Sequence, residues 1–327
     1  MSLPIHGQAP LLGIQDQHDQ ELQAVSSYLL DEDPNGIRIA AAIRRTYDML
    51  LDGQHTGRYK WSQLHKTEKT HFGTLIEINL QREFKFTDGE KMDYSIDDIE
   101  VDCKFSQKLA DWMIPPEAIG HILLGVWASD SQGIWSAGLI RAQEEFLTTS
   151  KGNRDGKRWL SKYGRSHIQW IYRDLQLPEN ALLHIPEEKV DLVFNCSEYG
   201  TKRIDMLFRL AQKRPISRTV VATVAQQDDF MKRIRGNGGS RSSLKPEGIV
   251  ILGQYSSHRE IAETLKLPAP GPGESVSVRL AIQKAHHGDR PYIELDAKRW
   301  VVALPEDPDE TAPDLPRIIP VTNSKIN

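Results

Sequence analysis

The sequence predicts a mixed α/β protein, and three observations support this fold class. Residues 37–53 and 66–86 repeat apolar side chains with the period of amphipathic helices. Residues 121–130 form a continuous apolar run that is typical of a strand buried on both faces, and residues 133–142 supply a neighbouring strand. Residues 99–105 alternate apolar and charged side chains, which indicates a strand with one face in the core. We therefore expect helices packed on a sheet.

The N-terminal 36 residues are acidic, with six Asp or Glu and no Lys or Arg. We expect one helix there, from Asp19 to Leu30, before a turn at residues 31–36. The chain has no apolar run of the ~18 residues that a membrane span needs, and its start lacks the basic region of a signal peptide. Its two cysteines, Cys103 and Cys196, suggest neither a disulfide scaffold nor a cysteine metal site. These features predict a cytoplasmic protein without a membrane segment.

A change in composition predicts two domains. Residues 173–189 bring two prolines, Pro178 and Pro186, and a polar run, which is typical of a linker, and we place the linker at residues 173–185. This linker divides a first domain, residues 37–172, from a second domain, residues 186–327, with residues 1–36 as a separate acidic segment. A chain of 327 residues is long enough for both.

The second domain is expected to contain both helices and strands. Helices are predicted at residues 201–214 and 226–236, and a strand at residues 247–253. Residues 216–225 fit either a strand or a short helix, because the run is β-branched but long enough for helix. From Pro305 onward the chain is rich in proline and acid, and we expect a poorly packed tail.

Several charged residues share one face of the strand predicted at residues 99–105. Residues two apart on a strand point the same way and lie ~6.5–7 Å apart, so Glu100, Asp102 and Lys104 lie on one face. Asp93 returns beside Asp102 if residues 90–94 pair with this strand as a hairpin. The charges then converge on one place.

Such a set suits metal-assisted hydrolysis of a phosphodiester. Mg²⁺ prefers carboxylate and carbonyl oxygens and keeps several waters, one of which can become the nucleophile. Asp93, Asp102 and the carbonyl of Cys103 supply these oxygens. Lys104 is placed to orient the water or to offset charge on the phosphorane.

A third carboxylate is expected from the helix at residues 66–86. It carries an apolar stripe that predicts one face packed on the sheet. The stripe consists of a four-residue repeat, Phe72, Ile76, Leu80 and Phe84, with Leu75 alongside. Glu77 flanks the stripe, and Gly73, one turn earlier, would permit close backbone approach. Glu77 is therefore the candidate for this carboxylate.

The spacing Asp-x8-Asp-x-Lys is the pattern of the PD-(D/E)xK nuclease superfamily. Alone it has little specificity, because an acid two residues before a lysine occurs on many exposed strands. Met92 also stands where a proline usually precedes the first acid. The alternative interpretation is a solvated strand face whose Asp and Lys merely pair.

Four longer segments resemble the NaeI-type restriction endonucleases. They are LLDGQHTGRYKWSQLHKTEKTHFGTLIEINLQREFKF, VDCKF, PPEAIGHILLGVWASD and TVVATVAQQDDFMKRIRGNGGSRSSLKPEGIVILG. The similarity runs in the same order through both halves and is weakest at the ends and over residues 143–200. It implies an N-terminal endonuclease domain and a C-terminal DNA-binding domain with a helix-turn-helix of the catabolite-activator kind.

The resemblance also implies how such an enzyme works. It implies a Mg²⁺-dependent homodimer that engages two copies of a GCCGGC palindrome in double-stranded DNA, one as effector and one as substrate. Carried over position by position, the active-site residues of the family fall on Glu77, Asp93, Asp102 and Lys104. Glu100 matches no role in the family, so we interpret it as an outlying charge.

The segment LLDGQH, residues 50–55, resembles the K-x-D-G-x-R motif of DNA ligases. Asp52 and Gly53 match that motif, whereas Leu50 replaces the lysine that carries the adenylate and His55 replaces the final basic residue. Leucine cannot form a phosphoramide, so ligation is not expected. The segment is interpreted either as a helix end followed by an Asp-Gly turn, or as a placement of Leu50 near the scissile strand.

A basic region indicates where the second domain binds DNA. Residues 197–248 contain eleven Lys or Arg and five Asp or Glu. The helix predicted at residues 226–236 and the glycine loop after it can present side chains to a groove and to phosphates. The candidates for DNA contact are Lys232, Arg233, Arg235, Arg241 and Lys245. The alternative is a solvated amphipathic helix.

Two further motifs and two further functions remain open. Residues 151–159 are a basic loop that suits either DNA backbone or plain surface, and AHHGDR, residues 285–290, is expected to be a turn rather than a metal site. A strand-nicking repair nuclease on the same core, or a winged-helix regulator with an inert nuclease-like half, are the alternative functions.

Overall fold

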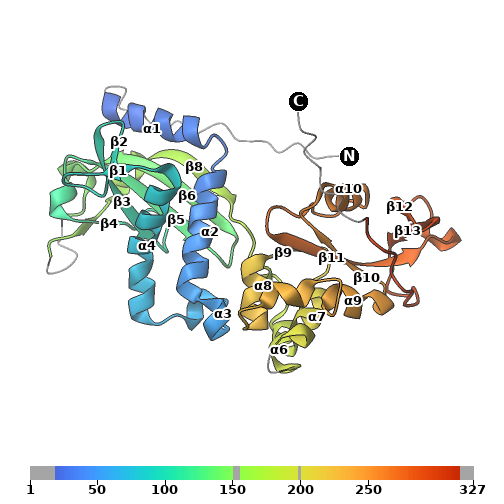
Figure 1. Ribbon diagram of the computed structural model, residues 1–327. Coiled ribbons are helices and arrows are strands. Elements are labelled where there is room, and N and C mark those ends of the chain that lie inside the picture. Colours follow the sequence, from blue (N-terminus) through green and yellow to red (C-terminus); the bar gives the residue numbers. More distant parts are fainter. Residues whose placement is uncertain (1–18, 150–154, 198–199, 317–327) are drawn as a thin grey trace, which may run out of the picture. The chain divides into compact units, whose positions relative to one another are not determined.

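The computed structural model describes residues 19–149, 155–197 and 200–316. Expectations for the start of the chain, for part of the basic loop at residues 151–159 and for the last residues lie outside these ranges. The chain forms two compact units (Figure 1), which are Met1–Leu50 with Trp61–Pro178, and Leu51–Lys60 with Glu179–Asn327.

A six-stranded mixed sheet forms the core of the first unit. Its order is β1-β2-β3-β5-β6-β8, in which β3 and β5 run parallel and the other neighbours antiparallel. The strands are β1 (Thr87–Asp88), β2 (Tyr94–Ile96), β3 (Ile99–Ser106), β5 (Ile122–Ser129), β6 (Ile134–Arg141) and β8 (Gln169–Gln176). Two short strands pair apart from this sheet, β4 (Met113–Ile114) and β7 (Arg158–Trp159). The predicted mixed α/β core is confirmed.

The helices of the first unit are α1 (Gln20–Glu32), α2 (Ile37–Leu51), α4 (Lys66–Phe84) and α5 (Lys162–Ser166). Helix α1 begins after Asp19, whose side chain accepts the Leu22 N–H at 3.0 Å as an N-cap. The expected helix at residues 37–53 ends at Leu51, because Asp52 adopts a left-handed φ of 46°. None of the helices in the described part of the chain combines the length and apolar character needed to span a bilayer.

Helix α4 packs on β3, and this contact brings the two halves of the candidate site together (Figure 1). The predicted stripe is confirmed, since Phe72, Ile76, Leu80 and Phe84 are all buried. The close backbone approach expected at Gly73 is wrong, because a Cβ atom placed there would meet nothing within 4 Å. The apolar stripe, and not a close approach at Gly73, therefore packs α4 against the sheet.

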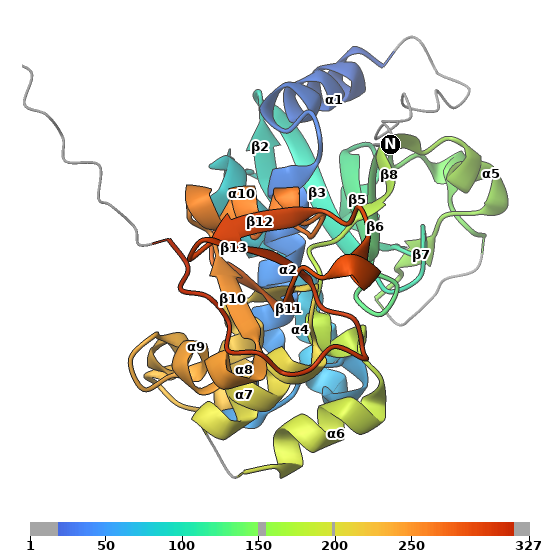
Figure 2. The same cartoon turned by 90° about the vertical axis from the view of Figure 1, so that its right-hand side faces the viewer.

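The second unit combines helices with a five-stranded sheet. Its helices are α3 (Gly53–Thr56), α6 (Glu187–Asn195), α7 (Thr201–Leu210), α8 (Arg218–Ala225), α9 (Ser240–Ser243) and α10 (Ser256–Thr264). Its strands are β9 (Pro215–Ser217), β10 (Ile249–Gly253), β11 (Glu274–Ile282), β12 (Tyr292–Leu295) and β13 (Lys298–Val302). Strand β11 is central, lying between β10 and β13 (Figure 2) and also pairing with β9.

The structure resolves one expectation for residues 216–236 and corrects another. The ambiguous residues 216–225 are the end of β9 followed by helix α8. The helix expected at residues 226–236 is instead a short 3-10 helix, Phe230–Ile234. Phe230 and Ile234 are buried there and pack in the core of the second unit.

The tail was expected to be poorly packed, and this was wrong for residues 305–316. Asp307 and Ala312 are buried, and the Ala312 N–H donates to the Lys245 carbonyl at 2.9 Å. Backbone hydrogen bonds and two buried side chains thus fix the segment on the second unit.

Candidate active site

A hairpin places Asp93 next to the strand that carries Asp102. Strands β2 and β3 pair antiparallel, with Tyr94 opposite Val101 and Ile96 opposite Ile99. A hairpin is present, but its first strand is Tyr94–Ile96 rather than the predicted residues 90–94, and Asp93 lies just before it. The Asp93 Oδ2 atom accepts the Cys103 N–H at 2.7 Å, so this side chain is fixed beside β3.

Lys104 lies between the two carboxylates. Its Nζ atom donates to Asp102 Oδ1 at 2.6 Å and to the Cys103 carbonyl at 3.0 Å, and it is 3.7 Å from Asp93 Oδ2. The Lys104 side chain is 24% exposed, whereas that of Asp102 is 7% exposed. Lys104 therefore presents one ammonium to solvent from a largely buried acidic cluster.

Glu77 joins this cluster from helix α4. The hydroxyl of the buried Tyr94 donates to the Glu77 backbone carbonyl at 2.8 Å, which ties the helix to the hairpin. Sequence analysis missed Tyr94. Its position directly after Asp93 was the available signal, because a buried tyrosine needs a partner for its hydroxyl.

The electrostatics of the cluster favour protonated acids in the absence of a cation. Burial, together with the charge of Asp93, raises the pKa of Glu77 to about 7. Burial also raises the pKa of Asp102 despite its contact with Lys104. The pKa of Lys104 is raised as well, because Asp102 and Asp93 outweigh the effect of its burial. A group of acids that resists ionisation is typical of a site that gains a positive ion.

One atom of this cluster indicates that a metal ion would fit. Asp102 Oδ2 is buried and has no hydrogen-bond partner among the described residues. An unpaired buried oxygen of this kind costs about 1–3 kcal/mol, which a bound cation would recover. The available donors, the carboxylates of Asp93, Asp102 and Glu77 and the carbonyl of Cys103, are all oxygens, the type that Mg²⁺ prefers.

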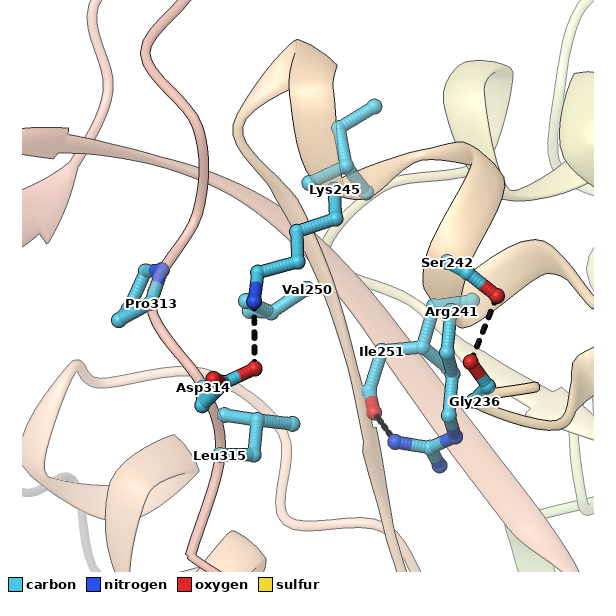
Figure 3. Close-up of a pocket in the computed structure, with 10 residues that line it drawn as sticks. Gly236, Arg241, Ser242, Lys245, Val250, Ile251, Pro313, Asp314 and Leu315 are labelled. Atoms are coloured by element: carbon cyan, nitrogen blue, oxygen red, sulfur yellow. Dashed lines mark hydrogen bonds and ion pairs between the residues drawn. The ribbon is translucent and has the colours of Figure 1, made fainter.

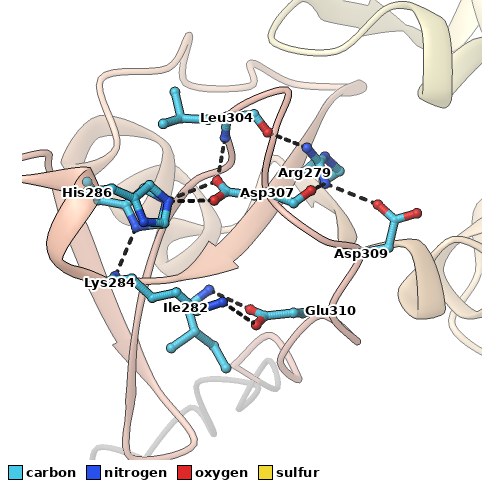
Figure 4. A network of polar contacts seen from close by, with 9 residues as sticks. Arg279, Ile282, Lys284, His286, Leu304, Asp307, Asp309 and Glu310 are labelled. Atoms are coloured by element: carbon cyan, nitrogen blue, oxygen red, sulfur yellow. Dashed lines mark hydrogen bonds and ion pairs between the residues drawn. The ribbon is translucent and has the colours of Figure 1, made fainter.

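A second group of possible ligands lies in the other unit. His286, His287 and Asp307 form a set, found among the described residues, whose ligand atoms lie within 4.8 Å of one another. Figure 4 shows His286 and Asp307 of this set. The Nδ1 atom of His287 accepts the Lys284 N–H at 2.9 Å, so in the neutral ring Nε2 carries the proton that it donates to Asp307 at 2.9 Å. That tautomer leaves no lone pair at Nε2 for a metal.

Asp307 instead acts as a structural anchor. It also accepts from His286 at 2.8 Å and from the Leu304 N–H at 2.7 Å. The histidines lie in a 3-10 turn, Ala285–His287, as expected for AHHGDR. This network fixes the start of the C-terminal segment.

The five residues predicted to contact DNA lie in the 3-10 helix Phe230–Ile234 and the loop and short helices after it. Lys232 and Arg235 are exposed, and Asp229 pairs with Lys232 at 3.8 Å and with Arg233 at 2.8 Å. They do not share one regular helix, contrary to expectation, because Arg235 follows the end of the 3-10 helix.

The other two residues line a cavity of about 290 Å³ in the second unit (Figure 3). Arg241 donates to the Ile251 carbonyl, and burial lowers the pKa of its guanidinium. Lys245 donates to Asp314 at 2.5 Å. Arg241 and Lys245 therefore both have hydrogen-bond partners within the chain.

The ligase-like segment has the geometry of a helix end and a turn. Leu50 is 8% exposed, and the Asp52 side chain contacts His55 Nδ1 at 2.6 Å. Gly53 is required by close packing, because a Cβ atom there would lie 2.1 Å from the Thr223 hydroxyl. These contacts explain the Asp-Gly pair without a catalytic role.

Two comparisons with known proteins identify the class. A family model described as "Restriction endonuclease NaeI" matches residues 23–311. The chain is also 49% identical over 306 residues to the "Type II restriction enzyme NaeI" of Lentzea aerocolonigenes, an alignment that covers 91% of this chain and 95% of that protein. The chain is thus a type II restriction enzyme, a site-specific deoxyribonuclease. It belongs to the restriction endonuclease NaeI family.

Proposed function

We propose that this enzyme is a Mg²⁺-dependent, two-site restriction endonuclease that hydrolyses double-stranded DNA at the palindrome GCCGGC through a PD-(D/E)xK-like site. The observation that carries the proposal is the cluster of Asp93, Asp102 and Lys104, in which one buried oxygen of Asp102 lacks a partner among the described residues. The matches to the NaeI family support the same activity.

Each residue of the cluster has a distinct proposed role. Asp93, Asp102 and the Cys103 carbonyl would hold Mg²⁺, with Glu77 as a ligand directly or through water. A bound Mg²⁺ would supply Lewis-acid polarisation of the phosphate and a lowered pKa for a bound water. Lys104 would orient the attacking water and offset the charge that develops on the phosphorane.

The second unit is proposed to bind the effector copy of the recognition site. Helix α8 and the 3-10 helix after it are the helical pair that we propose as the helix-turn-helix. Lys232 and Arg235 are exposed cations on the connecting segment and suit contacts to phosphates or guanines. A homodimer in the cytoplasm would match the two-fold symmetry of a palindrome.

The proposal is tested with plasmids that carry no, one or two GCCGGC sites. We expect cleavage only with Mg²⁺, loss of cleavage in excess chelator, and faster cutting of the plasmid with two sites. Sequencing of ends from a digested DNA library then gives the recognition sequence directly. Equal cutting in chelator would contradict the metal-dependent site, and ends at another sequence would contradict GCCGGC. Nicked circles without linear product would favour the strand-nicking alternative.

A further inference from the structure

Glu100 lies on the strand face that carries Asp102 and Lys104, but it is not an outlying charge. One carboxylate oxygen, Oε1, accepts the Glu90 N–H at 2.7 Å. The other, Oε2, accepts the Lys91 N–H at 3.0 Å and the Met92 N–H at 2.7 Å. One side chain therefore holds three successive backbone amides of the loop that leads to β2, an arrangement in which consecutive N–H groups form an anion-binding concavity.

The loop is built to close around this carboxylate. A Cβ atom at Gly89 would lie 2.3 Å from the Met92 carbonyl oxygen and 2.9 Å from Glu100 Oε2. Only glycine permits such an approach of the backbone. The position of Gly89 and the three hydrogen bonds are thus two independent signs of the same fixed loop.

The residue that follows this loop is Asp93. Its backbone position is set from the N-terminal side by the Glu100 contacts at residues 90–92, and its side chain is set by the Cys103 N–H at 2.7 Å. Strand β3 thus carries Asp102 and Lys104 and, through Glu100, also fixes the loop that delivers Asp93. Strand β3 therefore fixes the positions of Asp93, Asp102 and Lys104 relative to one another.

We propose that Glu100 is a positioning residue that holds Asp93 in place for metal binding without touching the ion or the substrate. This inference rests on the proposed Mg²⁺ site. Partners that orient metal ligands commonly contribute about 10-fold or more to metal affinity. Loss of the Glu100 contacts therefore weakens metal binding, while Lys104 and Asp102 keep their own hydrogen bonds.

The test compares Glu100→Ala, Glu100→Gln and Gly89→Ala with the wild-type enzyme. Glu90→Gln is the matched control, because Glu90 is exposed and its substitution removes one negative charge from the same loop without removing a Glu100 hydrogen bond. Mn²⁺ binding to DNA-free protein is followed by the EPR signal of the free ion. The Mg²⁺ dependence of single-turnover plasmid cleavage is measured in parallel.

We expect Glu100→Ala to weaken Mn²⁺ binding about 10-fold and to raise the Mg²⁺ midpoint of cleavage equally, with most of the rate restored at saturating Mg²⁺. Gly89→Ala should act in the same direction without any change of charge, and Glu90→Gln should match the wild type. Glu100→Gln keeps the side-chain volume and some acceptors, so it gives a smaller shift and replaces Glu100→Ala if that variant does not fold.

Wild-type Mn²⁺ affinity and an unshifted Mg²⁺ midpoint in a folded Glu100 variant would overturn the inference. So would a rate that falls equally at every Mg²⁺ concentration, because that result indicates damage unrelated to metal binding. Wild-type cleavage that needs no Mg²⁺ would instead contradict the proposed function itself, so the two failures are distinguishable.

Discussion

Replacing Lys104 with methionine removes the ammonium from the acidic cluster while keeping much of the side-chain length. In the structure Nζ lies 2.6 Å from Asp102 Oδ1 and 3.7 Å from Asp93 Oδ2. The variant therefore loses two close charge interactions and the hydrogen bond to the Cys103 carbonyl. Its expected consequences are electrostatic and catalytic.

The size of the electrostatic effect follows from these distances. Two unit charges ~4 Å apart interact by about 4 kcal/mol at an effective dielectric constant of ~20, and partial solvent exposure of Lys104 reduces this to about 2 kcal/mol. Since one pKa unit corresponds to about 1.4 kcal/mol, the pKa of Asp102 should rise by a further ~1–2 units. Removing a group that orients the attacking water lowers the rate by about 100-fold or more.

The assay is single-turnover cleavage of a supercoiled plasmid across a pH series, with DNA binding measured in parallel. We expect Lys104→Met to cut at least about 100-fold more slowly, to bind DNA normally, and to require a higher pH for Mg²⁺ activation. Lys108→Met is the control, because Lys108 is exposed and lies just beyond the end of β3. A folded Lys104→Met enzyme with wild-type rate and pH profile would refute the role of Lys104.

Three further predictions concern other residues. The pKa of Glu77 is raised to about 7 from 4.5, so protonated Glu77 favours the folded state. In the metal-free protein this stabilisation should be fully present below pH ~4.5 and should be lost as pH rises through ~7. The free energy of unfolding should fall by on the order of 1 kcal/mol, after allowance for the partial exposure of Glu77. Denaturant titrations should show this slope in the wild type and not in Glu77→Gln; equal slopes would contradict it. Asp307→Asn should lower the free energy of unfolding by about 1–3 kcal/mol, because an amide cannot accept all three hydrogen bonds of Asp307; an unchanged unfolding curve would contradict the anchor. Because Leu50 is buried at a helix end, Leu50→Lys should leave the product fully cut, and resealed plasmid would contradict this and place Leu50 near the scissile strand.

The parts of the candidate site on α4 and β3 could be predicted, because the periodic spacing of apolar residues determines which face of each element is buried. The stripe of Phe72, Ile76, Leu80 and Phe84 gave α4 its buried face. The alternation of apolar and charged residues predicted the charged face of β3. The hairpin places Asp93 next to the strand that carries Asp102. These features depend on neighbours in sequence, which a pattern reports directly.

Other parts depended on contacts that no local pattern reports. Glu100 binds backbone amides, which every residue has, so its partners left no trace in composition. The helical pattern of residues 226–236 did not report that only Phe230–Ile234 would form a helix, and one of the 3-10 type. The C-terminal segment is anchored through Asp307 by His286 and His287, about twenty residues earlier, whereas its proline and acid content suggested a loose tail.

The most direct test of the central claim, that the acid–lysine cluster is the Mg²⁺-dependent cutting site, is Asp102→Ala. Plasmid cleavage in Mg²⁺ and DNA binding would be measured on the same folded preparation. We expect Asp102→Ala to bind the GCCGGC site as the wild type does and to leave the plasmid uncut. Cleavage at the wild-type rate by Asp102→Ala would contradict it.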